Sequence, residues 1–71
     1  MAEPRYIYEF DYSGADLIYI GKATIGTAVG AFGWQLMKLT YTAGNATSIL
    51  FADGNSAYDN VWTDRATYAY S

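Results

Sequence analysis

The segment from Trp34 to Gly54 constrains the fold more than any other part of the chain. It reads WQLMKLTYT, then AGNAT, then SILFADG, so that two apolar runs flank a short loop of small and polar residues. β-Branched and aromatic residues are typical of strands, and the Ala43-Gly44-Asn45 sequence is typical of a turn. The pattern predicts a β-hairpin whose arms are apolar on both faces, so the rest of the chain must cover them.

The length of the chain limits how this hairpin is stabilised. At 71 residues the chain has room for one domain, and we expect a single β domain spanning 1–71. A core of this size rarely contributes more than about 3–5 kcal/mol without a disulfide, a metal or an oligomer. The chain has no cysteine and no histidine, which excludes a disulfide and removes the commonest zinc ligand and the commonest general base. By elimination we expect a homo-oligomer that needs no cofactor.

The composition also points to an interface. Charged residues make up 15% of the chain and aromatic residues 18%, with eight tyrosines, whereas about 25% of an average domain is charged. Because a small fold is mostly surface, many of these rings must lie near it. Tyrosine is favoured where an apolar surface meets a partner. The alternative is that the tyrosines only line the two faces of a thin sheet.

Charge and hydropathy argue against two classes of partner. The net charge is −3 and the four basic residues form no run, so we expect no nucleic acid. No apolar segment approaches the roughly 18–20 residues of a membrane span, so we expect no membrane partner. The first ten residues lack the pattern of a signal peptide. The absence of cysteine is compatible with synthesis in a reducing cytoplasm.

The first part of the chain predicts a second hairpin. After a lead of Met1–Pro4, residues 5–12 alternate, with aromatic residues on one face and polar residues or Ile7 on the other. A turn at 13–16 leads into LIYIGKAT, a strand that is apolar on both faces. The Gly-rich stretch 22–33 then lacks the Gly-Lys-Ser/Thr ending of a phosphate-binding loop, so we interpret it as a structural loop.

The last part of the chain predicts one helical turn and a final strand. Ser56 followed by Asp59 resembles a capping box that starts a turn through Val61 and Trp62, and ATYAYS alternates so that Tyr68 and Tyr70 point outward. The whole pattern predicts an all-β fold, a small antiparallel β-sandwich or partly open barrel of about five short strands with one helical turn.

No group of residues matches a catalytic or metal-binding pattern, and we expect no enzyme. Asp53, Asn55 and Asp59 could offer oxygen ligands to calcium, but they lack the spacing of an EF-hand loop and fit a turn and a helix cap better. Trp34, Trp62 or the pair of Tyr68 and Tyr70 could stack on sugars, although a fold this small needs its indoles in the core.

Two sets of residues are therefore the candidates for function. Arg65, close to Trp62 and Asp64, can stack on an indole and pair with a carboxylate at once. We expect a structural lock formed by Trp34, Trp62, Asp64 and Arg65. The candidate interface consists of the tyrosines that the strand pattern turns outward, namely Tyr6, Tyr8, Tyr12, Tyr68 and Tyr70.

Three segments, YIGKATIGT, WQLMKLTY and SILFADGNSAYDNVWTDRATYAY, resemble a group of very short virion-associated proteins of tailed bacteriophages. The resemblance covers Tyr19 to Tyr70, and its most specific part is Trp62-Thr63-Asp64-Arg65-Ala66. It implies a structural protein made in the host bacterial cytoplasm and located in the virion. Such a protein would decorate or cement the capsid, or belong to the tail, by packing against itself and the major capsid or tail protein. The alternative is a receptor- or carbohydrate-binding knob of a tail fibre.

Overall fold

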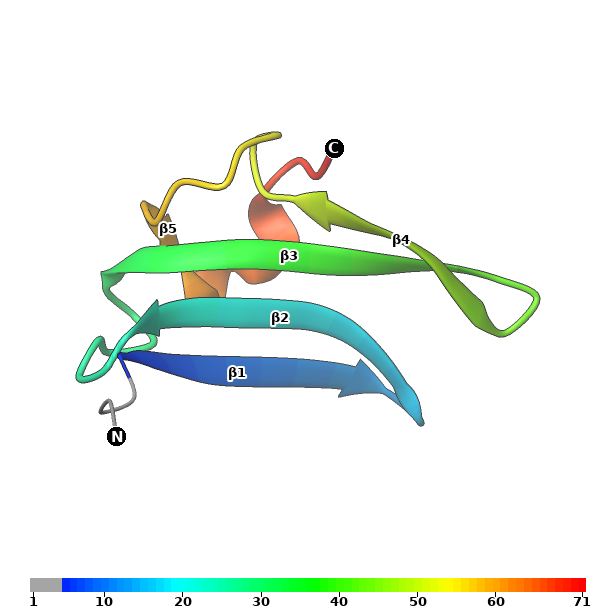
Figure 1. Ribbon diagram of the computed structural model, residues 1–71, viewed down its shortest axis with the longest axis horizontal. Coiled ribbons are helices and arrows are strands. Elements are labelled where there is room, and N and C mark those ends of the chain that lie inside the picture. The colour runs from blue at the N-terminus through cyan, green and yellow to red at the C-terminus, as the bar shows by residue number, and fades with distance from the viewer. Residues whose placement is uncertain (1–4) are drawn as a thin grey trace.

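The chain folds into one twisted antiparallel sheet with a short 3₁₀-helix. The computed structural model describes residues 5–71, and the predicted lead Met1–Pro4 lies outside the described residues. The elements are β1 (Tyr6–Ser13), β2 (Asp16–Thr24), β3 (Phe32–Thr42), β4 (Asn45–Phe51), β5 (Asn60–Val61) and the 3₁₀-helix η1 (Trp62–Thr67). Strands β1 to β4 follow one another across the sheet in sequence order, and β5 pairs with the beginning of β3 (Figure 1). The predicted all-β fold with one helical turn is confirmed.

Tight turns close both predicted hairpins. Ala43 and Gly44 have φ angles of 52° and 85°, and two successive positive φ values are the signature of the turn that matches the twist of a β-hairpin. Gly14, with a φ of 63°, occupies the turn between β1 and β2. The two hairpins join edge to edge through β2 and β3, from Tyr19 opposite Lys38 to Lys22 opposite Gln35.

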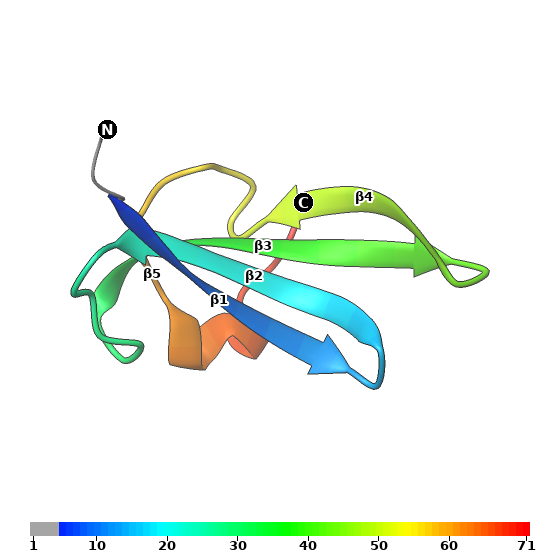
Figure 2. The same ribbon diagram turned by 60° about the horizontal axis from the view of Figure 1, so that its bottom comes forward.

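The core lies on one face of this sheet only. Strand β5, η1 and the C-terminal residues form the second layer, which lies behind the sheet in Figure 1 and below it in Figure 2. This layer takes the place that a second sheet would have in a sandwich. The buried apolar side chains between the layers are Ala23, Trp34, Leu36, Ala52, Val61 and Trp62.

Gly21 allows the two tryptophans to pack directly against the backbone of β2. A Cβ atom at this position would lie 2.6 Å from Cε3 of Trp62 and 3.0 Å from Cε3 of Trp34. The indole centroids are 6.1 Å apart with their planes tilted by 40°, within the range of centroid distances at which aromatic rings attract each other. Any side chain at position 21 would therefore displace the rings that form the core.

Hydrogen bonds attach the second layer to the sheet. The buried Asn60 of β5 donates from Nδ2 to the Trp34 carbonyl at 3.1 Å. The indole Nε1 of Trp34 itself donates to the carbonyl of Ala28, in the loop before β3, at 2.9 Å. The C-terminal residues pair with the end of β4, where Phe51 and Ser71 exchange two backbone hydrogen bonds of 3.1 Å. The C-terminal residues therefore lie along the outer edge of the sheet, at the end of β4.

The predicted details of residues 56–71 are wrong in three respects. The helical turn begins at Trp62, after β5, and no side chain caps it, so Ser56 and Asp59 do not form a capping box. The segment predicted as a final strand is helical up to Thr67 and keeps only one bridge to the sheet. Tyr68 and Tyr70 pack against the core cluster instead of pointing outward. Burial of Trp62 over Gly21 outweighs the local pattern, because the indole is the largest apolar group available to cover the sheet.

We expect Gly21→Ala to destabilise the fold by about 1–3 kcal/mol, the usual cost of overpacking a core. The Gly30→Ala variant is the matched control, because a Cβ at Gly30 meets nothing within 4 Å and its φ is not positive. Urea denaturation followed by tryptophan fluorescence measures both. Equal urea midpoints for the two variants would show that the packing of the two indoles does not require a glycine at position 21.

Candidate functional site

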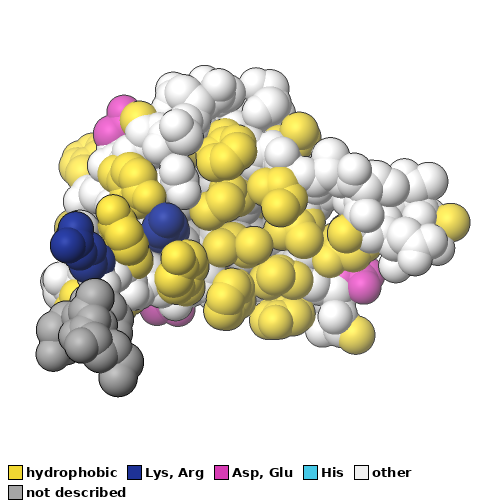
Figure 3. All heavy atoms as spheres, in the orientation of Figure 1, with side chains coloured by type: hydrophobic (Ala, Val, Ile, Leu, Met, Phe, Trp, Pro, Cys, Tyr) yellow, Lys and Arg dark blue, Asp and Glu magenta, His cyan; other side chains and the backbone are white. Residues whose placement is uncertain are grey.

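The sheet face opposite the core carries no second layer within residues 5–71, and we call it the open face. Only the loop before β5 reaches one end of it, where Gln35 donates to the Ser56 carbonyl at 2.9 Å. Strand alternation and register place its members together: Tyr8 lies opposite Lys22, Phe10 opposite Ile20, and Leu39 opposite Ile49. The open face consists of Tyr6, Tyr8, Phe10, Tyr12, Ile20, Lys22, Gln35, Met37, Leu39, Ile49 and Phe51. Figure 3 shows hydrophobic side chains gathered over its centre, with acidic side chains only at the margins.

Several large side chains of the open face are more than half exposed. The exposed fractions are 52% for Tyr8, 53% for Phe10, 57% for Tyr12 and 53% for Ile49. Contiguous apolar patches of this kind are uncommon on monomeric proteins and mark interaction surfaces. These side chains are exposed because the second layer, formed by β5, η1 and the C-terminal residues, lies on the core side of the sheet.

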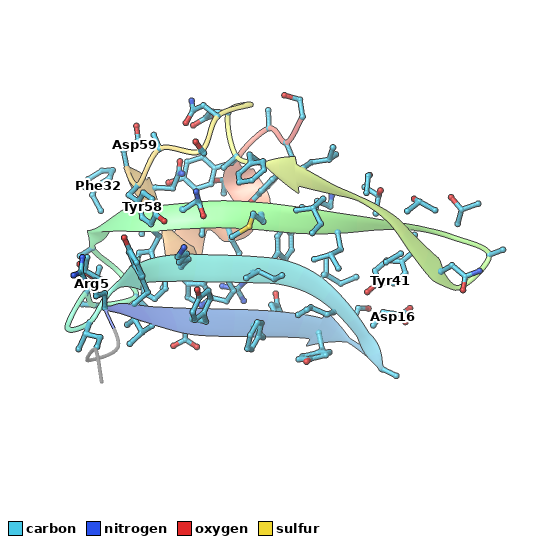
Figure 4. All side chains as sticks on the ribbon, viewed as in Figure 1. Arg5, Asp16, Phe32, Tyr41, Tyr58 and Asp59 are labelled. Carbon is cyan, nitrogen blue, oxygen red and sulfur yellow. The ribbon has the colours of Figure 1, made fainter. Side chains whose placement is uncertain are left out.

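A lysine surrounded by tyrosines lies at one end of the open face. Nζ of Lys22 is 4.4 Å from the ring centroid of Tyr6 and 5.9 Å from that of Tyr8, within the range of cation–π attraction. Tyr58, from the loop before β5, stacks on Tyr6 with centroids 6.0 Å apart, and Figure 4 shows it at the end of the sheet where β3 begins. The Tyr58 hydroxyl is the largest influence that raises the pKa of Lys22, so this end of the face carries a positive charge.

The structure divides the five tyrosines predicted as an interface between two faces. Tyr6, Tyr8 and Tyr12 lie on the open face as exposed side chains. Tyr68 and Tyr70 lie on the core side, where their hydroxyls are engaged: Tyr68 accepts from the Val61 N–H at 2.9 Å, and Tyr70 donates to the Arg65 carbonyl at 2.7 Å. These two tyrosines hold the second layer together and form no common surface with the other three.

Other members of the open face were not among the sequence candidates. Met37, Leu39, Ile49 and Phe51 belong to arms that are apolar on both faces, so alternation alone does not tell which side each residue faces. The register between β3 and β4 settles the question. Tyr58 was missed because it reaches the face from a loop, where no strand period applies.

Arg65 makes the predicted stacking contact but pairs with a different carboxylate. Its guanidinium carbon lies 4.4 Å from the ring centroid of Trp62, and its Nη1 donates to the Trp62 carbonyl at 3.2 Å. Its Nε donates to Oδ2 of Asp11 at 2.9 Å, whereas Asp64 is exposed. The lock of Trp34, Trp62 and Arg65 is thus completed by Asp11, which joins η1 to β1 across 54 positions of sequence.

The other residues considered for ligands have structural roles. Oδ1 of Asn55 accepts the Ala57 N–H at 2.9 Å, which is the side-chain-to-backbone bond of a turn. Trp34 and Trp62 are buried, so neither indole is available to a sugar. Within residues 5–71, the surface has no pocket and no three acidic, cysteine or histidine residues gather as a metal site. No helix in this part of the chain has the length and hydropathy to cross a membrane.

Comparisons with protein-family models, with curated proteins and with solved structures find no match for this chain.

We expect Arg65→Lys to lower the free energy of unfolding by about 1–2 kcal/mol, because lysine lacks the planar group that stacks on Trp62 and bonds Asp11 at the same time. Arg5→Lys, at an exposed position in front of β1, is the control and should leave the stability unchanged. Thermal unfolding monitored by circular dichroism gives the comparison. A melting temperature for Arg65→Lys equal to that of the Arg5 variant would contradict the lock.

Because the Tyr70 side chain is partly buried, we expect the protein to lose stability at alkaline pH. Burial, with the Tyr19 and Tyr68 hydroxyls adding to it, raises the pKa of Tyr70 to about 12 from an ordinary 10.0. Because the unfolded chain releases this proton first, the contribution of Tyr70 is complete below pH 10 and is lost as the pH rises toward 12. Tyr70→Phe should be less stable than wild type by about 1 kcal/mol at pH 8, since the bond to the Arg65 carbonyl is gone.

The difference between wild type and Tyr70→Phe should then narrow between pH 10 and pH 12 in denaturant titrations. Tyr8→Phe, at an exposed position, serves as the control and should follow wild type through this range. A difference that stays constant with pH would contradict the proposed titration.

Proposed function

We propose that this chain is a non-enzymatic structural protein of a tailed-bacteriophage particle, a capsid-decorating or cement protein or a tail component. It acts by packing its open face against a subunit of the major capsid or tail protein. The open face is the observation that carries this proposal, because contiguous exposed apolar side chains mark surfaces that bind a partner. The resemblance of the Trp62–Ala66 segment to virion proteins is the reason for proposing a phage particle as the assembly.

The composition of the open face favours packing over chemistry. Lys22 is its only side chain that is charged at neutral pH, and the rest are aromatic, aliphatic or amide groups. Such a surface offers no carboxylate or imidazole for acid–base catalysis. It offers large rings that lose little conformational entropy when buried and tyrosine hydroxyls that bond acceptors on a partner.

The exposed apolar area of the open face suits many copies of the chain repeated on one particle. Full burial of a large apolar side chain contributes about 1.5–3 kcal/mol, and Tyr8, Phe10, Tyr12 and Ile49 each have about half of their surface left to bury. Together they supply about 3–6 kcal/mol, close to the lower end of the cost of associating two proteins. A single contact is therefore weak, while many copies held on one particle gain from their high effective concentration.

The stacked pair of Tyr6 and Tyr58 favours a second candidate function, a carbohydrate-binding knob of a tail fibre. Exposed aromatic rings are suitable platforms for sugars, and Lys22 beside them adds a hydrogen-bond donor. A glycan array separates the two functions. Binding that disappears in Tyr6→Ala would favour the knob, and the absence of binding would favour the packing function.

We expect Ile49→Lys to reduce incorporation of the chain into particles of its phage at least tenfold, because the variant places a charge in the centre of an apolar contact. Ala66→Lys, at an exposed position of η1 on the other side, is the matched control and should be incorporated like wild type. Mass spectrometry of washed particles measures the amounts, and circular dichroism checks that both variants fold. Absence of the wild-type chain from the particles would contradict the proposed function.

A further inference from the structure

Strand β1 forms one edge of the sheet and presents a regular row of backbone groups. It pairs with β2, and no other strand within residues 5–71 lies along its outer side (Figures 1 and 2). The Ile25 N–H donates to the Arg5 carbonyl at 3.2 Å, so the backbone of Arg5 faces β2. Because these groups alternate along an antiparallel strand, the N–H and C=O groups of Tyr6, Tyr8 and Phe10 point outward from the edge.

This edge has few of the features that prevent strands from pairing. It is eight residues long and contains neither proline nor lysine, although natural edges often use both. Asp11 projects toward the core side but is neutralised by Arg65 at 2.9 Å. The other edge of the sheet is covered at its end, where Ser71 pairs with Phe51 of β4.

We propose that two copies of the chain pair through β1, antiparallel, about a two-fold axis that passes through Tyr8. In this register Tyr8 lies opposite Tyr8 of the second copy, Tyr6 opposite Phe10, and Arg5 opposite Asp11. A strand that pairs with itself in this way forms a closed, self-complementary contact. Residues that oppose one another share a face of the sheet, so the two open faces join into one continuous surface.

The charges on β1 disfavour a register centred on Glu9. An axis at Glu9 would place the two Glu9 side chains directly opposite each other, and like charges in that position are destabilising. An axis at Tyr8 places Glu9 opposite Ile7 and the exposed Arg5 opposite Asp11, whose charge Arg65 already balances within the chain. Both axes oppose residues whose backbone groups point outward, so the side-chain charges decide between these two registers.

The role of this pairing rests on the proposed function. A dimer would double the area of open face that one unit offers to the particle. Antiparallel β1 contacts leave the side chains of the open face uncovered. The surface that binds the capsid or tail subunit is therefore separate from the edge that binds the second copy, and the two can be tested independently.

Single cysteines test the register directly, because the chain has no cysteine of its own. Tyr8 and Phe10 are matched, with exposed fractions of 52% and 53%. Two copies of residue 8 would have Cα atoms about 5.5 Å apart, within reach of a disulfide, whereas the Cα atoms of two copies of residue 10 would be about 15 Å apart. Under mild oxidation of the full chain, Tyr8→Cys should form a covalent dimer at least tenfold faster than Phe10→Cys.

A mixture of Tyr6→Cys and Phe10→Cys should also cross-link, and mostly as the mixed dimer. Equal rates for Tyr8→Cys and Phe10→Cys, or a faster reaction of Glu9→Cys, would overturn the proposed pairing. Analytical ultracentrifugation gives a second measurement. Tyr8→Pro removes the outward N–H as well as the ring, while Tyr8→Thr removes the ring alone, so the proline variant should dimerise at least tenfold more weakly. Equal dimer constants for two folded variants would overturn the pairing.

The outcome for the edge can be distinguished from the outcome for the particle. A chain that remains monomeric in solution and still enters particles would refute the β1 pairing and leave the proposed function intact. A chain that cross-links at Tyr8 but is absent from particles would refute the function and leave the pairing intact.

Discussion

The absence of a side chain at Gly21 is the constraint on which the rest of the structure depends. It lets Trp62 and Trp34 lie against the backbone of β2, where a Cβ would stand 2.6 Å from one indole and 3.0 Å from the other. Trp62 in turn holds the guanidinium of Arg65, which bonds Asp11 on β1. A chain without cysteine thus connects its last elements to its first through two indoles and one ion pair.

The same constraint explains why the opposite face is open. Both tryptophans are used on the core side, and the short second layer places no element over the other side of the sheet within residues 5–71. The apolar residues that remain on β1, β3 and β4 form the open face, with Lys22 held by tyrosine rings at one end. One face of the sheet therefore holds the buried core, and the other face exposes apolar side chains. The proposed function rests on this difference between the two faces.

Much of the fold can be predicted from the sequence because the hairpins are locally encoded. The alternation of residues 6–12, Gly14, and the Ala43-Gly44 pair each determine structure within a few positions. The segment 56–71 could not be predicted in this way, since Trp62 and Tyr70 are placed by contacts with distant strands. For the same reason Tyr68 and Tyr70 were assigned to a surface, and Asp64 was expected where Asp11 lies. The part of the open face on β1 follows from alternation, while Ile49 and Tyr58 need the register and the loop path.

The central claim is that the open face is covered in the assembled state and exposed in the free chain. Hydroxyl-radical footprinting of the protein, free and in purified phage particles, measures this residue by residue. The account predicts that Tyr8, Phe10, Tyr12 and Ile49 become protected in the particle, while Thr63 on the other side of the sheet reacts equally in both states. Equal oxidation of the four open-face residues in both states, or protection confined to η1, would contradict the account.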